Sequence, residues 1–452
     1  MIHSPDDPIV ALATSFASSA LAVIRVSGQG SVPLLSRLVR GGGLSRQPGH
    51  TIHHCFIHES GEDVDEVMIA VYNAPRSYTG EDGAEIFCHG SIPVIQRLLS
   101  LLTRSGFRPA GPGEFTQRAF LNGRMDLTRA EAVNEIVRAR TDRARALALQ
   151  RLGGAIEGKI RSARDGLVQL RAGLEAAIDY PEDDHDRELV DDRLLSQVVE
   201  TLQGLTRTYQ RGRVYQEGAS VVIAGATNSG KSSLFNALLR QDRAMVSDVH
   251  GTTRDWIEAT ISMKGIPVRL FDTAGLRSTE DPLEIEGMRR TEHLLSAADL
   301  VVFMVDGSAG DGSAPGAGDG KLLPGVDGVP VVRAWNKVDL PTRLPAPQGF
   351  IPISAVSGEG LDRLEDAIAR ELLGGPPGES AEPLIDSVRQ RDLIAGALEA
   401  LGRFRDAREH GTSPDLLAVD LAAALDCLGE ITGEVVTEEI LDRMFSSFCV
   451  GK

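Results

Sequence analysis

The stretch that decides the fold is SVVIAGATNSGKSSLFNALL, residues 220–239. Its centre, from Gly225 to Ser232, fits the pattern G-x-x-x-x-G-K-[ST] and lies between a short apolar run and an amphipathic helical pattern. This strand–loop–helix order is the context that a phosphate-binding loop, or P-loop, requires. Backbone N–H groups of such a loop wrap phosphates, Lys231 can reach the β and γ phosphates as a catalytic residue, and the Ser232 hydroxyl can ligate Mg²⁺. The stretch therefore predicts an α/β domain that binds a nucleoside triphosphate.

Motifs downstream of this loop specify the nucleotide. In LFDTAG, residues 270–275, Asp272 ends an apolar run, where its carboxylate can hold the Mg²⁺ shell, and Gly275 can offer its N–H to the γ-phosphate. In WNKVD, residues 335–339, the aspartate can accept two hydrogen bonds from the edge of guanine, which adenine cannot donate. The sequence therefore predicts GTP. The expected contacts to GTP are Asn228, Ser229, Gly230, Lys231, Ser232, Ser233, Asp272, Gly275, Asn336, Lys337, Asp339, Ser354 and Ala355.

The residues expected to promote hydrolysis lie in and around this loop. Many small GTPases carry a glutamine after the DTAG glycine to orient the attacking water, but Leu276 stands here, and an apolar side chain cannot do so. Glu284 is the candidate replacement, and the alternative is a solvated glutamate at a helix start. Thr253, in VSDVHGTTRD (residues 246–255), can complete the Mg²⁺ coordination. Asn228 has a side-chain oxygen suited to K⁺, which could replace the arginine that other GTPases borrow.

Composition narrows the class of protein. The chain has 452 residues, of which 42% are hydrophobic and 25% charged, as is ordinary for a multidomain globular protein. Acidic residues outnumber basic ones by 64 to 47, for a net charge of −17, and only 4% are aromatic. This balance argues against a general nucleic-acid coat protein, although a local basic patch is compatible with it. No signal peptide and no apolar run of membrane-spanning length is visible, so we expect a cytoplasmic protein without membrane contact.

The spacing of apolar residues follows three different patterns along the chain. Residues 1–120 alternate short apolar runs with Gly, Pro and Ser clusters, which indicates a mixed α+β unit. Apolar residues at intervals of three and four over 129–178 predict long amphipathic helices. Strand-like runs alternate with helical patterns over 218–375, as in a parallel sheet, and helical periodicity returns after 374–380. The α/β domain is therefore expected to be inserted into a helical domain built from both flanks. The expected strands are 221–224, 268–271, 300–305, 331–335 and 351–353.

The chain ends in FSSFCVGK, residues 445–452, with Cys449 four residues from the end. C-terminal tails usually fray, and an exposed thiol is a liability unless its chemistry is used. A prenylation signal is disfavoured because Gly451 and Lys452 do not fit its last two positions. The remaining alternative is a small buried hydrophobe that packs against Phe445 and Phe448. The cysteines are too scattered for a disulfide framework or a zinc site: Cys55, Cys88, Cys427 and Cys449.

A histidine-rich stretch, HTIHHCFIH (residues 50–58), suggests a metal site at first sight. Strand alternation, however, places His54 and Cys55 on opposite faces, and no second cluster of ligands is evident. The pattern therefore favours ordinary strand residues.

The motifs GATNSGKSS, GTTRD, DTAGLR and NKVD, together with the terminal FSSFCVGK, resemble those of the tRNA modification GTPase MnmE family, also called TrmE. The resemblance extends to VIRVSG, PRSYTGEDGAEIFCHGS, GPGEFTQRAFLNGRMDLTRAEAV and IDYPEDD, so it covers essentially the whole chain. It implies a multidomain protein of α/β and α+β type. Its expected parts are an N-terminal α+β domain for tetrahydrofolate binding and dimerisation (1–122), a discontinuous helical domain (123–217 and 379–452) and an inserted Ras-like P-loop GTPase domain (218–378).

The resemblance also implies an activity. Members of this family are K⁺-stimulated GTPases, in which dimerisation of the G domains activates hydrolysis. With the FAD-dependent partner MnmG they install an aminomethyl or carboxymethylaminomethyl group at C5 of the wobble uridine of certain tRNAs. The one-carbon unit comes from a tetrahydrofolate derivative, 5-formyl- or methylenetetrahydrofolate. The expected partners are therefore a second copy of this chain, MnmG in a heterotetramer, and tRNA.

Individual residues take roles from the same resemblance. The expected Mg²⁺ ligands are Ser232 and Thr253, and the expected K⁺ ligands are Asn228, Val246, Asp248 and Thr252. Glu284 would position the attacking water through a second water, and Cys449 would be the family's functional cysteine beside the folate. The expected folate contacts are Arg25, Glu85, Arg124 and Lys452. Family members more often carry lysine in place of Arg124, and TSFASSA (14–20) replaces a Pro-Gly-Arg-Gly type of sequence at the folate-site entrance.

Five arginines on the helix predicted over 129–178 have two interpretations. They can contact tRNA phosphates, or they can form a solvated helix face. They are Arg138, Arg140, Arg143, Arg145 and Arg151.

Two other classes of function compete with this one. One is a switch for ribosome assembly, in which GTP gates RNA binding without one-carbon chemistry. The other is a folate-binding module whose G domain is purely regulatory. The N-terminal folate motifs and Cys449 discriminate against the ribosome-assembly switch.

Overall fold

The computed structural model describes residues 7–179, 190–241, 257–272, 294–308, 328–341, 345–378 and 383–452. The chain divides into two compact units, which we describe separately. The first unit is formed by residues 1–137, 151–161 and 425–452, and the second by residues 138–150 and 162–424. Each unit therefore combines segments that are distant in the sequence.

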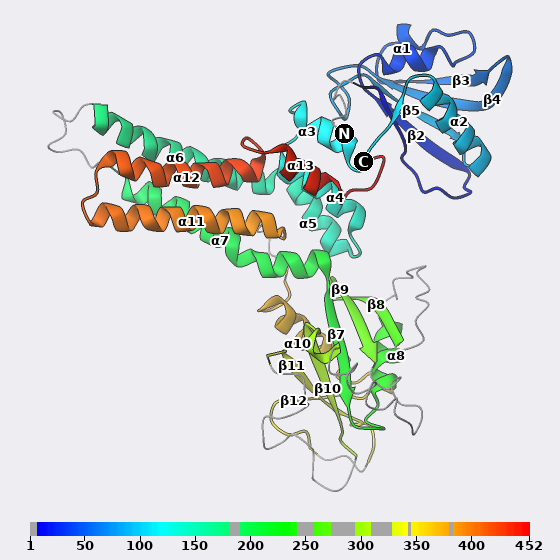
Figure 1. Cartoon of the computed structure of the whole chain (residues 1–452). Helices are drawn as coiled ribbons and strands as arrows, with labels where there is room; N and C mark the ends of the chain where they lie inside the picture. The colour runs from blue at the N-terminus through cyan, green and yellow to red at the C-terminus, as the bar shows by residue number, and fades with distance from the viewer. Residues whose placement is uncertain are drawn as a thin grey trace, which may run out of the picture. The chain divides into compact units, whose positions relative to one another are not determined.

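A six-stranded sheet lies at the centre of the first unit (Figure 1). Its strands are, in spatial order, β3 (Thr51–Glu59), β4 (Glu62–Tyr72), β5 (Gly83–His89), β2 (Leu21–Ser27), β1 (Ile9–Leu12) and β6 (Arg108–Pro109). Neighbours are antiparallel except β1 and β6, which are parallel. Along β2 the alternate residues Ala22, Ile24 and Val26 are buried. Because side chains alternate along a strand, Arg25 points to the opposite face of the sheet.

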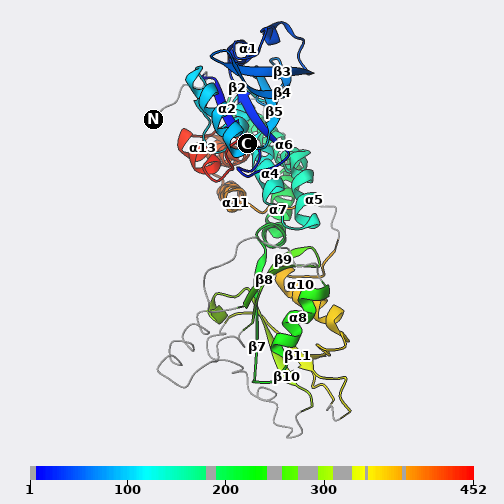
Figure 2. The same cartoon turned by 90° about the vertical axis from the view of Figure 1, so that its right-hand side faces the viewer.

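Helix α2 (Ile92–Arg104) covers the apolar face of this sheet (Figure 2). Its buried residues Ile95, Leu98 and Leu102 belong to one cluster with the apolar residues of β2. Ser91 caps the helix by accepting a hydrogen bond from the Val94 N–H at 3.4 Å. This unit also contains α1 (Ser31–Ser36), η1 (Leu44–Arg46), α3 (Glu114–Leu121) and α13 (Glu438–Phe445), most of α4 (Leu127–Arg138) and one end each of two longer helices described below.

The C-terminal tail is bound to the N-terminal part of the chain. The Gly113 N–H donates to the Cys449 carbonyl at 3.3 Å, and the Phe115 N–H donates to the Lys452 carbonyl at 3.1 Å. Gly451 has a φ of +91°, and a Cβ atom there would lie 2.6 Å from the Leu12 carbonyl oxygen, so only glycine fits. The two aromatic residues of the tail, Phe445 and Phe448, are buried in one apolar cluster. The cluster also contains Leu127 and Ala130 of α4 and Leu441 of α13. The tail is therefore an ordered part of the first unit.

A second six-stranded sheet forms the α/β part of the second unit. Its strands are, in spatial order, β12 (Phe350–Pro352), β11 (Val331–Asn336), β10 (Leu300–Asp306), β7 (Ala219–Gly225), β9 (Ile266–Asp272) and β8 (Ile257–Met263). All neighbours are parallel except β8, which is antiparallel to β9. The five parallel strands are the predicted ones, which confirms the parallel sheet. The prediction missed β8, an edge strand joined to β9 by a tight turn in which Lys264 and Gly265 both have positive φ.

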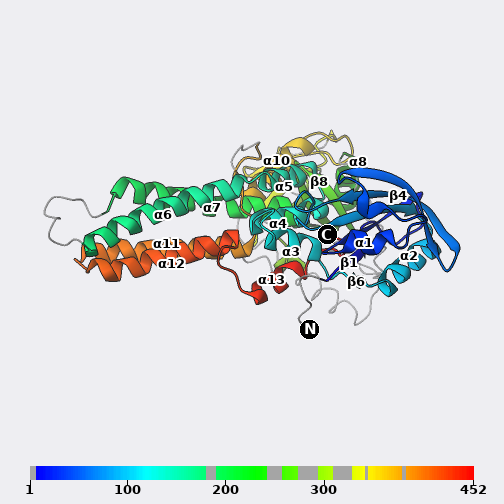
Figure 3. The same ribbon diagram turned by 90° about the horizontal axis from the view of Figure 1, so that it is seen from above.

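Helices from both sides of this α/β segment lie side by side in the second unit (Figures 1 and 3). They are α7 (Asp192–Glu217), α11 (Val388–Glu409) and the parts of α6 (Ala155–Asp179) and α12 (Pro414–Thr432) within this unit. The Arg408 guanidinium binds the Asp192 carboxylate through two hydrogen bonds, of 2.6 and 2.8 Å. The flanking helical segments therefore pack together, as their periodicity predicted. Helices α8 (Lys231–Gln241) and α10 (Leu361–Leu373) pack on the α/β sheet itself.

The five arginines do not share one long helix, so this prediction was wrong. Arg138 is the last residue of α4, and a new helix, α5 (Asp142–Leu152), begins after a break at which Thr141 accepts a hydrogen bond from the Ala144 N–H. Arg151 is buried and forms an ion pair of 2.6 Å with Glu135. Arg151 therefore has a structural role and is not available to tRNA phosphates.

The helices in the described ranges were compared with the requirements for a membrane-spanning helix. None of them combines the length and the apolar character that a bilayer crossing requires.

Candidate functional site

The P-loop joins β7 to α8 and has the conformation that phosphate binding requires. Asn228 and Gly230 have φ values of +63° and +97°, which turn successive backbone N–H groups toward one side of the loop. A Cβ atom at Gly230 would lie 2.2 Å from the Asn336 amide nitrogen, so a larger residue does not fit. The Lys231 ammonium donates to the carbonyls of Gly225 at 3.1 Å and Ala226 at 2.9 Å, which holds its charge at the loop.

The two oxygen groups expected to serve Mg²⁺ lie in contact. The Ser232 hydroxyl donates to the Asp272 carboxylate at 2.8 Å, across 40 residues of sequence. Asp272 is buried at the end of β9, next to β7. Hydroxyl and carboxylate oxygens are hard ligands of the kind that Mg²⁺ prefers, so these residues fit the ion.

The base-recognition motif is attached to the P-loop through Asn336. Its amide donates to the Ser229 carbonyl at 2.8 Å and accepts from the Ala355 N–H at 3.0 Å, so one side chain fixes three segments. The Lys337 ammonium binds the Asp306 carboxylate at 2.5 Å. Burial alone would raise the pKa of Asp306, but the bonds from Lys337 and Ser308 hold it below its ordinary value. Asp339 is exposed at the end of this motif, while Ser354 and Ala355 are buried.

Several predicted residues of the GTP site lie outside the described residues. They are Val246, Asp248, Thr252, Thr253, Gly275 and Glu284. Their roles in binding K⁺ and Mg²⁺ and in positioning water stay predictions.

A second candidate site is a cavity of about 450 Å³ in the first unit. One wall is polar and comes from β2, β5 and the segment between β4 and β5, and the other is apolar and comes mainly from α4. The lining residues are Arg25, Val26, Ser27, Tyr72, Ser77, Tyr78, Thr79, Gly83, Ala84, Glu85, Phe115, Val133, Ile136, Val137, Leu152 and Lys452. A pocket of this size with few polar groups is typical of small-molecule sites.

Arg25 is the central polar residue of this cavity. Its guanidinium donates two hydrogen bonds to Glu85, at 3.0 and 2.7 Å, and one to the Gly451 carbonyl at 3.1 Å. The rings of Tyr78 and Phe115 lie with their centroids 5.7 Å from its guanidinium carbon. Arg25 therefore connects the sheet, the start of α3 and the C-terminal tail at one point.

Two tyrosines present neutral hydroxyl groups near this arginine. Burial, together with the charge of Glu85, raises the pKa of Tyr72, whose hydroxyl lies 3.5 Å from that carboxylate. Burial also raises the pKa of Tyr78, which bonds to the Thr116 hydroxyl at 2.9 Å. Both phenols therefore keep their protons at neutral pH and can act as hydrogen-bond donors.

The cavity contains three of the four predicted folate residues: Arg25, Glu85 and Lys452. Arg124 does not line it; this side chain is exposed, with its stem beside Gly80. Sequence reasoning missed Tyr78 and Phe115, although both lie within motifs that it singled out. Nothing in the local pattern indicated that these rings would flank an arginine from another strand.

The structure bears on two earlier interpretations, one of Cys449 and one of the histidine-rich stretch of residues 50–58. Cys449 is exposed, so the interpretation as a small buried hydrophobe was wrong. His54 pairs with Glu66 at 2.6 Å across the strands, and the described residues contain no group of three potential metal ligands. The histidine-rich stretch is therefore a strand, β3, as expected.

Three features define a GTPase of the P-loop class. They are a P-loop after a parallel strand, a buried aspartate, Asp272, bonded to the P-loop residue Ser232, and an Asn-Lys-x-Asp turn on the same sheet. Comparison with known proteins gives the family. Residues 8–124 match the family described as "GTP-binding protein TrmE N-terminus", and residues 127–449 match "MnmE helical domain". The chain belongs to the family of tRNA modification GTPases named MnmE, which confirms the resemblance and the fold class.

Similar proteins span the full length of the chain. The tRNA modification GTPase MnmE of Carboxydothermus hydrogenoformans is 40% identical over 466 residues, covering 99% of this chain and all of the relative. Its counterpart in Moorella thermoacetica is 42% identical over 467 residues, with the same coverage. That of Aquifex aeolicus is 39% identical over 455 residues, again with the same coverage.

Proposed function

We propose that this protein hydrolyses GTP to drive modification of the wobble uridine in tRNA, in the cytoplasm. With an MnmG partner it would install an aminomethyl or carboxymethylaminomethyl group at C5, with a one-carbon unit from 5-formyl- or methylenetetrahydrofolate. The observation that carries the proposal is full-length membership of the family together with a built guanine-nucleotide site, in which Asn336 links the P-loop to the base-recognition strand.

The GTPase chemistry rests on charge placed around the phosphates. Lys231 and the loop N–H groups would bind the phosphate oxygens, and Ser232 would ligate Mg²⁺ together with Thr253, with Asp272 holding the ion's shell. K⁺ held by Asn228, Val246, Asp248 and Thr252 would neutralise charge that develops in the transition state. Asn228 supports this because its positive φ places it on the turn of the loop, where its side chain is exposed. Glu284 would then orient the water.

The cavity of the first unit is the proposed tetrahydrofolate site. A reduced folate has a flat ring with N–H donors and an anionic glutamate tail, and the cavity offers the Glu85 carboxylate, the Tyr78 and Phe115 rings and the Lys452 cation. The proposed contacts are Arg25, Glu85 and Lys452, with Arg124 outside the wall. The Cys449 thiol, at the start of the bound tail, would act as the nucleophile toward the one-carbon unit or the uracil ring.

The wider assembly follows from the family. We propose a homodimer through the domain of residues 1–122, a heterotetramer with MnmG, a helical domain from 123–217 and 379–452, and activation by pairing of the G domains of residues 218–378. Family membership favours this function over a ribosome-assembly switch.

Comparison of GTP turnover in K⁺ and Na⁺ tests the ion proposal. Release of phosphate from GTP should be faster in K⁺ by at least about tenfold, the scale of one well-placed charge in the transition state. The variant Asn228→Ala should abolish the difference between the two ions. Equal rates in both salts, with GTP affinity unchanged, would refute the proposed K⁺ site.

Nucleoside mass spectrometry of tRNA tests the modification itself. Cells that lack the protein should lose the C5-modified wobble uridine, and the wild-type gene should restore it. Cys449→Ser should fail to restore it, whereas Cys427→Ser, a matched change at a half-buried cysteine on α12, should succeed. Full restoration by Cys449→Ser would remove the thiol from the chemistry.

A further inference from the structure

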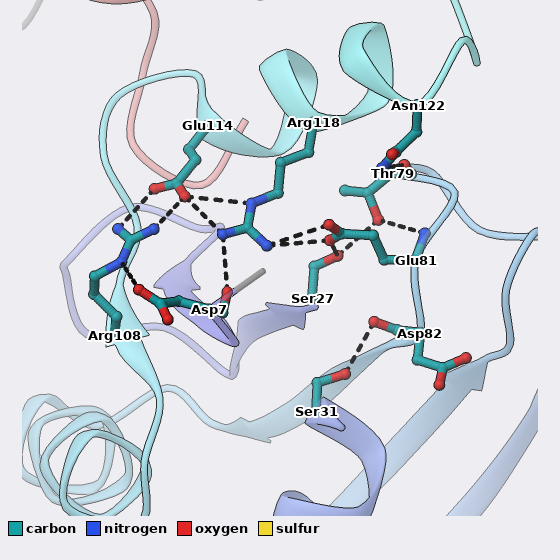
Figure 4. Close-up of polar contacts among 10 residues, drawn as sticks. All are labelled: Asp7, Ser27, Ser31, Thr79, Glu81, Asp82, Arg108, Glu114, Arg118 and Asn122. Atoms are coloured by element: carbon teal, nitrogen blue, oxygen red, sulfur yellow. Dashed lines mark hydrogen bonds and ion pairs between the residues drawn. The ribbon is translucent and has the colours of Figure 1, made fainter. Parts of the chain in front are cut away.

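A network of charged side chains joins α3 to the segment between β4 and β5 and to Asp7 (Figure 4). At its centre is Arg118, on α3, whose side chain is only 3% exposed. Its guanidinium donates to both oxygens of Glu81 at 3.3 Å, to Glu114 at 2.9 Å and to the Asp7 carbonyl at 2.8 Å. A buried guanidinium is tolerated only when its donors are satisfied, so Arg118 fixes all of these groups.

One arm of the network leads to the cavity. Glu81 accepts a hydrogen bond from the Ser27 hydroxyl at 2.8 Å, and Ser27 is bonded to the Thr79 hydroxyl at 2.6 Å. Ser27 and Thr79 both line the cavity. The Glu81 N–H in turn donates to Thr79 at 3.2 Å. Since Ser27 donates to Glu81, the hydroxyl proton of Thr79 is directed to Ser27, and the orientation of both hydroxyls depends on Glu81.

The other arm leads to the C-terminal tail. Glu114 is the first residue of α3, and it accepts bonds from Arg108 at 2.5 and 3.0 Å and from the Gly111 N–H at 2.8 Å. Its two neighbours in the chain, Gly113 and Phe115, donate their N–H groups to the carbonyls of Cys449 and Lys452. The position of Glu114 therefore sets the position of the tail.

We propose that Arg118 is a positioning residue for the modification reaction. It fixes the position of the tail that carries Cys449 relative to the polar wall of the cavity. Arg118 does not line the cavity; it acts through Glu81 on one side and through Glu114 on the other. The inference rests on the proposed function, because it assigns the wall to folate and the thiol to the chemistry. The two acidic partners make the arms separable by mutation.

Hydrogen exchange followed by mass spectrometry on the full chain tests the coupling without ligand. Arg118→Met should speed exchange by about tenfold or more both at Glu81 and at Gly113–Phe115, since a hydrogen bond to a charged group contributes on that scale. Glu81→Gln should affect mainly the Glu81 segment, and Glu114→Gln mainly Gly113–Phe115. Arg108→Gln is the matched comparison: because Arg108 contacts Glu114 and Asp7 but forms no bond to Glu81 in the described residues, exchange should rise at Gly113–Phe115 and stay unchanged at Glu81.

The functional readout separates positioning from folding. Arg118→Met should lower the turnover of tRNA modification at saturating folate by about tenfold while GTP hydrolysis stays unchanged, and Arg118→Lys, which keeps the charge with fewer donors, should recover part of the loss. Exchange that rises at only one arm in Arg118→Met, or that rises equally along β3 and β4, would overturn the inference. Failure of the wild type to bind 5-formyltetrahydrofolate would instead refute the proposed function, and the exchange data would still decide the coupling.

Discussion

The P-loop and the cavity are the two candidate binding sites, and their parts come from different distances in the sequence. The loop occupies eight consecutive residues, 225–232, and Lys231 bonds to carbonyls only five and six residues away. In the cavity, Arg25 bonds to Glu85, 60 residues away, and to Gly451, 426 residues away. A site made by local backbone geometry can be recognised in the sequence as a motif. A site made by long-range side-chain contacts appears in the sequence only as scattered residues. The following experiments test this difference, beginning with the largest expected effect.

Gly230→Ala should impair GTP binding by adding a single methyl group to the loop. A Cβ atom at φ +97° is strained and would lie 2.2 Å from the Asn336 amide, so GTP affinity should fall by roughly 100-fold or more. Titration with a fluorescent GTP analogue measures this. Gly204→Ala, in the open interior of α7, is the matched control and should leave affinity unchanged. Wild-type affinity in Gly230→Ala would show that the loop is not held against Asn336.

Gly451→Ala should release the tail without affecting the loop. The new Cβ atom would lie 2.6 Å from the Leu12 carbonyl oxygen at a φ of +91°, so the tail bonds should open and exchange at Phe115 should rise by about tenfold. Gly123→Ala, with a φ of +67° but open space around it, separates backbone strain from the clash. GTP affinity should be equal in all three proteins. Unchanged exchange at Phe115 would contradict the docking of the tail.

Acid should loosen the tail. Burial would raise the pKa of Glu114, but hydrogen bonds from Arg108, the Gly111 N–H and Arg118 outweigh it and lower the value. A lowered pKa in the folded state gives stability that is present above the ordinary value of 4.5 and is lost as the pH falls through the lowered value. Cleavage by pepsin, which works in acid, should therefore increase at Phe448 as the pH drops below 4.5.

The variant Glu114→Gln supplies the control for this pH effect. It cannot ionise, so it should show weaker tail protection above pH 4.5 and a flatter dependence on pH below it. The same pH dependence in wild type and variant would exclude Glu114 as its source.

Arg124→Ala should have the smallest effect, although sequence reasoning placed Arg124 in the folate site. Its side chain is exposed and does not line the cavity, so affinity for 5-formyltetrahydrofolate should change by about twofold at most. Arg25→Ala, which removes the guanidinium bonds to Glu85 and to the Gly451 carbonyl, should weaken binding by roughly tenfold or more. Calorimetric titration compares the two. Equal losses would mean that ligand contacts extend beyond the cavity.

Failures of the sequence analysis share a cause. The strand β8 was missed because its residues lie on the sheet edge and do not form a continuous apolar run. The break before α5 was missed because apolar spacing continues across it, while Thr141 caps the new helix and donates its hydroxyl to the Gly265 carbonyl, 124 residues away. Arg151 was expected on a helix face open either to tRNA phosphates or to solvent, and only its buried contact with Glu135 shows otherwise. In each case the deciding contact lies outside the local window that a pattern samples.

The sequence by itself determined the P-loop, the parallel strands and the order of the GTP motifs, because short-range backbone geometry and side-chain periodicity are written in consecutive residues. Tertiary structure alone decided that Arg25 lies near the Tyr78 and Phe115 rings, that Arg118 joins Glu81 to Glu114, and that the tail is ordered against α3. These contacts join side chains from β2, α3, an intervening loop and the end of the chain. The Arg118 charge can be buried only because the folded chain brings Glu81, Glu114 and the Asp7 carbonyl to it.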